Sequence, residues 1–330
     1  MENTLISAED VKFHTPDTAD YKWGETNFFY FYIPEIHLIG GIQTLNRKGL
    51  GTCFVDININ DNLSIDCMDH LYVDGQQHLP ATEKLEESKF ANGLSITAVN
   101  PPRDYEIHYA PDHDLIIDLH FRGLMDPYDI NDAKEDGSTK HLSLVPEPFS
   151  KGHFDLTGHV TGTFSHRGKS FDVNCVATMD HSWGPRSQKG MGITGAAWTD
   201  ANFGMDYTVH INTLLDATKP FKERYTFVSG YVREGEDIFS ISEAAFEATR
   251  LPHSENLIAA LTLKARDVRG KEHTLHGAVL ALCKPHQFPT FQIHHTLIRW
   301  VSEKGELGYG TNMEGQMLNE NIKRNQLLIG

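Results

Sequence analysis

Hydrophobic and polar residues alternate along most of this chain. Between Leu115 and Arg122, every second residue is hydrophobic and most of the residues between them are polar. A period of two residues is typical of strands that bury one face and expose the other. The same alternation recurs over residues 160–164, 171–179, 205–212, 225–232 and 261–283. The pattern therefore predicts an all-β protein built from many antiparallel strands, as in sandwiches and barrels.

Two of the predicted hairpins carry the same turn residues, Arg-Gly-Lys, at 167–169 and at 269–271. The repeated turn and the matching strand rhythm favour an internal duplication of two all-β units. The length of 330 residues also exceeds the usual size of one domain, about 100 to 200 residues. We therefore expect two antiparallel β-barrel domains in tandem, covering residues 1–188 and 189–330.

Helical signal is weak. Short helices are expected only at Thr82 to Asn92, at Ile241 to Arg250 and in the tail from Asn319. The segment from Asp126 to Lys140 is rich in Asp, Asn and Gly, which is typical of a surface loop.

The charge balance narrows the range of partners. The chain has 45 acidic and 29 basic residues, for a formal net charge of −16. A field of this sign repels nucleic acid and anionic membrane surfaces, so we expect neither as a partner. The N-terminus lacks a basic start followed by an apolar stretch, and no window resembles a membrane span, which favours a cytoplasmic protein. Four widely spaced cysteines without a CxxC pair are expected to be buried free thiols.

The densest cluster of reactive side chains is the run from Asp180 to Arg186, Asp-His-Ser-Trp-Gly-Pro-Arg. We expect Asp180 and His181 to end a strand before a Gly-Pro turn, pointing in different directions at the same rim. A carboxylate near an imidazole raises its basicity, which suits general acid/base catalysis near neutral pH. The alternative is an ion pair with Arg186 that only fastens a loop.

A pocket is predicted from the aromatic residues. Trp183 and Trp198 either wall a pocket or pack in the core, and the aromatic run from Phe28 to Tyr32 has more rings than one packed strand needs. Glu314 is either a second acid facing Asp180 or a solvated strand residue. The predicted catalytic residues are Asp180, His181 and Glu314. The predicted substrate-binding residues are Trp183, Arg186, Trp198, Tyr207, His210, Tyr309, Phe29 and Phe31.

No cofactor or metal site is predicted. The nineteen histidines include no HExxH motif or other grouping with ligand spacing, and the adjacent His294 and His295 would face opposite sides of a strand. The glycine-rich segment from Gly190 to Gly195 lacks the spacing of a phosphate-binding loop, and no GxSxG nucleophile elbow is present.

Three segments together resemble a known superfamily. They are the aromatic strand from Phe28 to Ile33 with its following Pro34-Glu35 and Gly40-Gly41, the segment from Gly158 to Arg186, and Gly308-Tyr309-Gly310. In these the chain is similar to the tandem lipocalin-like superfamily that includes carotenoid 1,2-hydratase (hydroxyneurosporene synthase) and the AttH-type proteins. It most resembles an uncharacterised bacterial branch that carries the Asp180 to Arg186 run.

The resemblance implies two barrel-like domains side by side, with a ligand cavity at or near their contact and no redox cofactor. Relatives hydrate double bonds of terpenoids or prenyl groups of plant phenolics, or cyclise polyenes. We therefore expect a hydratase, dehydratase, isomerase or cyclase that acts by acid/base chemistry on a hydrophobic terpenoid or steroid-like substrate.

In that scheme Asp180 or His181 transfers the proton, and His181 is the better donor if Arg186 pairs directly with Asp180. The alternatives are a carrier that binds the same hydrophobic molecule without changing it, and pericyclic catalysis by the shape of the cavity alone. We also allow for a homodimer.

Overall fold

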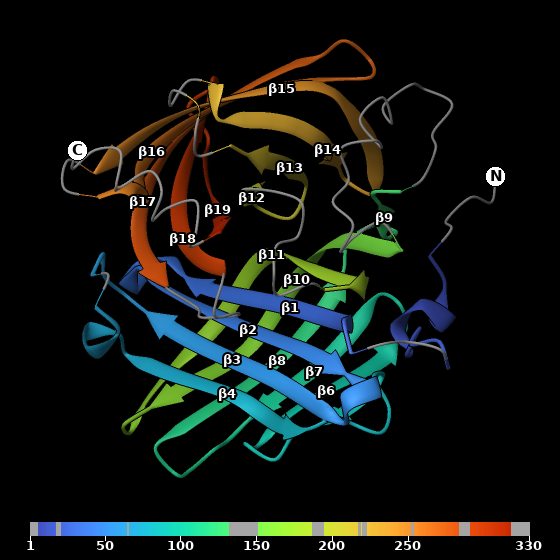
Figure 1. Cartoon of the computed structure of the whole chain (residues 1–330). Coiled ribbons are helices and arrows are strands. Elements are labelled where there is room, and N and C mark those ends of the chain that lie inside the picture. Colours follow the sequence, from blue (N-terminus) through green and yellow to red (C-terminus); the bar gives the residue numbers. More distant parts are fainter. Residues whose placement is uncertain are drawn as a thin grey trace, which may run out of the picture.

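The chain folds almost entirely into antiparallel strands (Figure 1). The computed structural model describes residues 6–17, 21–64, 66–131, 151–186, 195–216, 219, 223–251, 254–283 and 291–317. The predicted boundary between residues 188 and 189 and the predicted helix from Asn319 lie outside the described residues.

The first half forms one curled sheet of 11 strands, in the order β4-β3-β2-β1-β11-β10-β8-β7-β6-β5, with β9 paired to β10. Side chains tie its two ends together, because the hydroxyls of Tyr72 on β4 and Tyr109 on β7 lie 2.7 Å apart. The strands are β1 (Trp23–Ile33), β2 (Leu38–Arg47), β3 (Thr52–Asn60), β4 (Tyr72–Pro80), β5 (Glu87–Lys89), β6 (Leu94–Asn100), β7 (Asp104–Tyr109), β8 (Leu115–Gly123), β9 (Tyr128–Asp129), β10 (Gly152–His166) and β11 (Lys169–Pro185).

The second half is a closed barrel of eight strands that follow one another in sequence, with β19 returning to pair with β12. Closure pairs every strand on both sides, so the barrel has no free edge. The strands are β12 (Gly195–Phe203), β13 (Tyr207–Leu215), β14 (Tyr225–Glu234), β15 (Asp237–Leu251), β16 (Ser254–Asp267), β17 (Glu272–Cys283), β18 (Phe291–Ser302) and β19 (Leu307–Met317).

The predicted all-β class with two antiparallel units in tandem is confirmed, although the first unit is a curled sheet and not a closed barrel. Both Arg-Gly-Lys segments form hairpin turns, between β10 and β11 and between β16 and β17. In the first turn Arg167 and Gly168 have φ angles of 51° and 75°. Such left-handed values at both central residues match the twist of the flanking strands.

Two helix predictions are wrong. Residues 82–92 contain the short strand β5, and residues 241–250 lie within β15, where buried and exposed positions alternate. Glu243 and Ala245 favour helices, but here they pair with residues of β16. Contacts between strands therefore override the local helix propensity. The predicted loop from Asp126 contains the two-residue strand β9, and its part from residue 132 onward lies outside the described residues. The described helices are short 3-10 turns: η1 (Ala8–Val11), η2 (Pro34–Ile36), η3 (Lys48–Leu50) and η4 (Cys67–Asp69).

The barrel rests on the curled sheet at strands β1, β2, β10 and β11 (Figure 1). Hydrogen bonds cross this contact: the Tyr30 hydroxyl donates to Asp200, and the Asn202 amide donates to the Val176 carbonyl at 2.8 Å. One apolar core fills the curled sheet and continues into residues on the outside of the barrel, namely Trp198, Tyr231, Ala281, Cys283 and Leu297. A second core fills the barrel itself. The contact between the two units is therefore as buried as their interiors.

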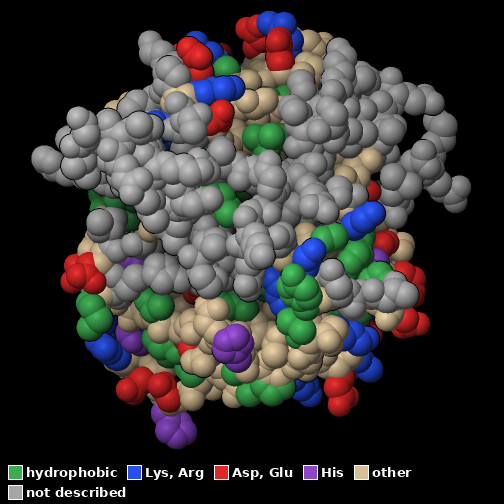
Figure 2. All heavy atoms as spheres, in the orientation of Figure 1, with side chains coloured by type: hydrophobic (Ala, Val, Ile, Leu, Met, Phe, Trp, Pro, Cys, Tyr) green, Lys and Arg blue, Asp and Glu red, His purple; other side chains and the backbone are tan. Residues whose placement is uncertain are grey.

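Charged side chains are scattered over the described surface and do not gather in one patch on the face shown (Figure 2). Within the described ranges, no helix has the length and apolar character needed to span a bilayer.

Candidate active site

Strand β11 carries the run from Asp180 to Pro185 without a break, and Pro185 is still paired with Trp23 of β1. The predicted Gly-Pro turn is therefore wrong. Proline is tolerated here because it is the last residue of its strand. Successive side chains of a strand point to opposite faces, so Asp180 points toward the barrel and His181 points into the curled sheet.

A buried carboxylate, Asp155 on β10, organises the side that faces the barrel. Its Oδ1 accepts hydrogen bonds from His153 Nε2 at 3.0 Å and Trp198 Nε1 at 2.8 Å. Its Oδ2 accepts from Asn212 Nδ2 at 2.8 Å and lies 3.0 Å from His210 Nε2. Asp155 is fully buried, and three of these four donors come from the barrel. This single side chain therefore joins the sheet to the barrel.

The charges around Asp155 keep it ionised. Burial alone would raise the pKa of this carboxyl, but His210 and His153 lower it well below its usual range. Burial would conversely lower the pKa of His153, yet Asp155 raises it above the ordinary value. Asp155 is thus a fixed negative charge in the contact between sheet and barrel.

Asp180 lies directly opposite Asp155 on the neighbouring strand, with Phe28 opposite it on its other side. It is half-buried, and no described residue donates a hydrogen bond to its side chain. Burial and nearby Asp155 together raise the pKa of Asp180 to about 6, against the opposing effect of His153 and Arg186. Two carboxyl groups side by side thus differ in character, one held ionised and the other able to carry a proton.

Arg186 does not hydrogen-bond to Asp180. Its guanidinium donates through Nη2 to the hydroxyls of Ser182 at 2.8 Å and Thr26 at 3.4 Å. The buried cation is close enough to act on the charge of Asp180, but none of its described hydrogen bonds goes to the carboxyl oxygens of Asp180. The direct ion pair that would favour His181 as the donor is therefore absent among the described contacts.

His181 is enclosed in the curled sheet. Its Nδ1 lies 2.7 Å from the carbonyl oxygen of Thr26, and its ring packs against Phe154 and Trp183. Burial lowers the pKa of His181 to about 4, with Glu25 opposing the change. The expectation that Asp180 and His181 share one rim is wrong, because the strand alternation places them in separate environments.

The remaining predicted residues divide between the two sides. Trp198 and His210 belong to the group of side chains that contact Asp155, here called the Asp155 cluster (His153, Asp155, Trp198, His210 and Asn212). The rings of Trp198 and His210 meet edge to face with centroids 5.2 Å apart. Tyr309 is half-buried on the outside of the barrel and packs against Tyr32. Three others lie inside the curled sheet: Phe29 packs on Tyr105 and Phe121, Phe31 packs on Phe164, and Trp183 stacks on His14.

Tyr207 lies at a different end of the barrel from the residues of the Asp155 cluster. Its hydroxyl lies 2.7 Å from His273 Nδ1, and His273 Nε2 lies 3.1 Å from Asp267. Tyr207 and His273 line part of an open cavity of about 630 Å³ whose other walls carry several Glu and Lys residues. The charged walls suit a polar ligand better than a hydrophobic one.

Glu314 lies inside the barrel and does not face Asp180. Its carboxylate accepts two hydrogen bonds from Arg250, at 2.9 and 3.0 Å, and one from the Tyr225 hydroxyl at 2.5 Å. Burial would raise the pKa of Glu314, but Arg250 lowers it below the usual range. The residue is therefore a permanently charged member of a buried ion pair and is not placed as a partner acid.

We expect Glu314→Ala to lower the free energy of unfolding by about 3 kcal/mol, because the change leaves the Arg250 charge buried without its partner. Urea unfolding of the full chain measures this loss. Glu247→Ala is the matched control, since Glu247 is exposed on β15 and its removal should change the free energy of unfolding by less than about 0.5 kcal/mol. Equal effects of the two substitutions would contradict the assignment.

Comparisons with known proteins place the chain in a family. A model of a domain of unknown function, DUF7064, matches residues 7–315. The chain belongs to the DUF7064 family. A search of curated proteins found no match to the DUF7064 chain.

Solved structures share the fold at low sequence identity. CghA superposes on the DUF7064 chain with a TM-score of 0.57 at 12% identity, covering 91% of this chain and 89% of CghA. Kievitone hydratase from Nectria haematococca gives 0.51 at 9% identity, covering 89% and 88%. A putative AttH from Nitrosomonas europaea gives 0.45 at 11% identity, covering 89% and 91%. The first two similarities show that the fold is shared.

The sequence analysis missed some residues of this candidate site, namely His153, Asp155 and Asn212. His153 and Asp155 are two residues apart on one strand and so share a face, which is a signal available from the sequence. Asn212 is likewise two residues from His210 on β13. Neither pair marks a site until the strand pairing brings β10 beside β11 and the barrel beside both.

Proposed function

We propose that this DUF7064 chain is an enzyme that hydrates, dehydrates, isomerises or cyclises a hydrophobic terpenoid or steroid-like molecule by acid/base chemistry without a redox cofactor. Asp180 is the proposed proton-transferring group. The observation that carries the proposal is a carboxyl group that no described residue hydrogen-bonds, half-buried between the curled sheet and the barrel, beside aromatic side chains. A protein that only carries a hydrophobic ligand gains nothing from burying a carboxyl group in this way.

The surroundings of Asp180 fit this role. Asp155, held by four donors, is a fixed anion directly across the strand pair and disfavours a second negative charge at Asp180. Arg186 lies near enough to stabilise the carboxylate once the proton has left. The site therefore supports both protonation states of Asp180, as a general acid/base requires.

In a hydration, the Asp180 proton forms a bond to one alkene carbon while the π electrons supply that bond, leaving a cation at the other carbon. A water molecule adds to the cation, and its proton returns to the Asp180 carboxylate. The ring faces of Phe28 and Trp198, which meet edge to face with centroids 5.5 Å apart, would stabilise the positive charge. Dehydration is the reverse of this reaction. Isomerisation follows if a carbon beside the cation loses a proton to the Asp180 carboxylate in place of water addition. Cyclisation follows if another alkene carbon attacks the cation in place of water.

Similarity of fold adds support, since kievitone hydratase, a hydratase by name, shares this fold over 89% of the chain. The carrier hypothesis is the alternative, because the same architecture would hold a hydrophobic ligand unchanged. The two functions differ in whether bound molecules are altered.

The test is incubation of the full chain in D₂O with a panel of terpenoid and steroid alkenes and alcohols, followed by mass spectrometry. The proposal predicts a product that has gained or lost one water, or an isomer with one carbon-bound deuterium. Heat-denatured protein is the control for uncatalysed change. Tight binding of panel members with unchanged mass and no deuterium would favour the carrier and overturn the enzyme.

A further inference from the structure

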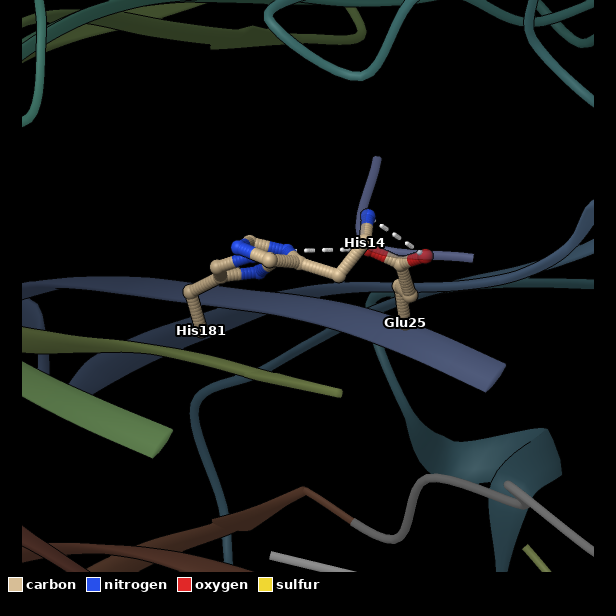
Figure 3. A group of neighbouring side chains, drawn as sticks. All are labelled: His14, Glu25 and His181. Atoms are coloured by element: carbon tan, nitrogen blue, oxygen red, sulfur yellow. Dashed lines mark hydrogen bonds and ion pairs between the residues drawn. The ribbon is translucent and has the colours of Figure 1, made fainter. Parts of the chain in front are cut away.

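Three metal-binding side chains meet at the end of the curled sheet, on the side away from Asp155. His14 comes from the segment after η1, Glu25 lies on β1, and His181 lies on β11 (Figure 3). One ligand atom from each residue lies within 4.8 Å of the other two. Glu25 and His181 share a face of neighbouring strands, since Asn27 pairs with His181 and Glu25 pairs with Trp183. His14 covers them from the N-terminal side (Figure 3).

The outer side of each imidazole is already engaged. His181 Nδ1 lies 2.7 Å from the Thr26 carbonyl oxygen, which can only accept, so Nδ1 carries the proton and Nε2 has a free lone pair. His14 Nε2 lies 3.3 Å from Asp10 Oδ1. Histidine ligands of metals usually donate their second ring N–H to a carbonyl or a carboxylate in this way. When each ring is neutral, the lone pair is therefore on the nitrogen that faces the cluster, which is Nε2 of His181 and Nδ1 of His14.

The inner nitrogens lie close to Glu25. His181 Nε2 is buried with no hydrogen-bonding partner among the described residues, and its residue is only 1% exposed. His14 Nδ1 lies 3.5 Å from Glu25 Oε2, an ion-pair contact when the His14 ring is protonated and not a close hydrogen bond. A buried acceptor without a partner is unfavourable, and a group bound at this position would satisfy His181 Nε2.

Glu25 is prepared as the third ligand. It is fully buried, and its two oxygens accept hydrogen bonds from the backbone N–H of His14 at 3.0 and 2.9 Å. The Thr15 hydroxyl donates to Oε1 at 2.5 Å and the Trp23 indole donates to the same oxygen at 3.2 Å. Oε2 keeps a lone pair for a cation, in a carboxylate whose orientation is fixed by its neighbours.

We propose that His14, Glu25 and His181 form a binding site for a divalent transition-metal ion of the zinc type, with water as the fourth ligand. Two imidazoles and one carboxylate are a donor set that suits Zn²⁺. Zinc bonds of about 2.0 to 2.1 Å require ligand atoms roughly 3.4 Å apart, so ligand atoms that now lie within 4.8 Å of one another would need to approach by up to about 1.4 Å. This site could not be predicted from a sequence motif, because His14, Glu25 and His181 are far apart in the chain.

The bound ion would fasten the N-terminal segment to the sheet. Ile6 and Val11 of that segment are already part of the apolar core, and the His14 ring stacks on Trp183 with centroids 3.7 Å apart. The ion would add a link from this segment to β1 and to β11 together. Its role is structural, and the inference does not depend on the proposed reaction at Asp180.

The test is titration of the EDTA-treated full chain with Zn²⁺ and with Co²⁺. We expect one equivalent of either ion to bind, Co²⁺ to give the visible absorption of a four-coordinate site, and Zn²⁺ to raise the Tm. His14→Ala should weaken Zn²⁺ binding at least about 100-fold and abolish the rise in Tm, since it removes a ligand. Asp10→Asn, which replaces the carboxylate beside His14 Nε2 with a neutral amide, should weaken binding by about 10-fold.

His120→Ala is the matched control, because it removes one exposed histidine from β8 and should leave the affinity for Zn²⁺ unchanged. Circular dichroism of each variant before titration shows that it is folded. His14 is partly exposed near the start of the chain, so its loss should leave the strands intact. Failure of the wild-type chain to bind one equivalent, or equal binding by His14→Ala and His120→Ala, would overturn the proposal. Neither outcome bears on turnover at Asp180.

Discussion

Replacing Asp155 with alanine is expected to lower the free energy of unfolding by about 3 to 5 kcal/mol. The change leaves His153, Trp198 and two further donors of the barrel without the acceptor they share. Each unsatisfied buried donor adds its own desolvation cost, which is why the loss exceeds that of a surface ion pair. Urea unfolding at neutral pH measures the effect.

Asp172→Ala on β11 is the control for the loss of one exposed carboxylate, and its effect on the free energy of unfolding should stay within about 0.5 kcal/mol.

The effect of Asp155→Ala on stability should also depend on pH. The pKa of Asp155 is lower in the folded chain than in an unfolded one, so its contribution is complete above about pH 5 and is lost as the pH falls below about 4. A difference between wild type and variant that stayed constant down to pH 3 would contradict this account.

The second large effect is expected on turnover. Asp180→Asn keeps the size of the side chain and removes its ability to transfer a proton, so kcat on any substrate found in the D₂O screen should fall by about 10²- to 10⁴-fold. Its stability should change by less than about 1 kcal/mol, because no described residue loses a hydrogen bond. Steady-state kinetics and urea unfolding of the same preparation separate the two effects.

Asp172→Asn is the matched control, since it makes the same chemical change at an exposed position of the same strand. Unchanged kcat in Asp180→Asn would remove Asp180 from the mechanism. A comparable fall in both variants would show that the loss is not specific to the contact between sheet and barrel.

The alternation of hydrophobic and polar residues was enough to predict the class of fold, because the buried face of each strand can be identified from the residues of that strand alone. The hairpin at Arg167 and Gly168 could likewise be predicted, since its turn chemistry is local. Whether the first sheet closes into a barrel could not, because closure depends on the meeting of β4 and β5, which lie at opposite ends of the strand order.

The site was harder to predict for the same reason. Asp180 and Trp198 were found because their residue types are conspicuous, but Asp155 becomes important only through donors from β12 and β13. His181 was grouped with Asp180 as a neighbour in the sequence, although neighbours on a strand face opposite ways. Pairing between strands, which a single sequence does not reveal, decides which ionisable groups meet.

The hydrogen bonds from the barrel to Asp155 also determine how the chain can be divided. A fragment ending at Arg186 would present Asp155, Phe28 and Tyr30 to water, and a fragment starting at Gly195 would present Trp198 and His210. Neither fragment should be soluble when expressed alone, whereas co-expression should let them reassemble. An attempt to obtain a minimal catalytic module by truncation would thus discard half of the surface on which the proposed chemistry depends.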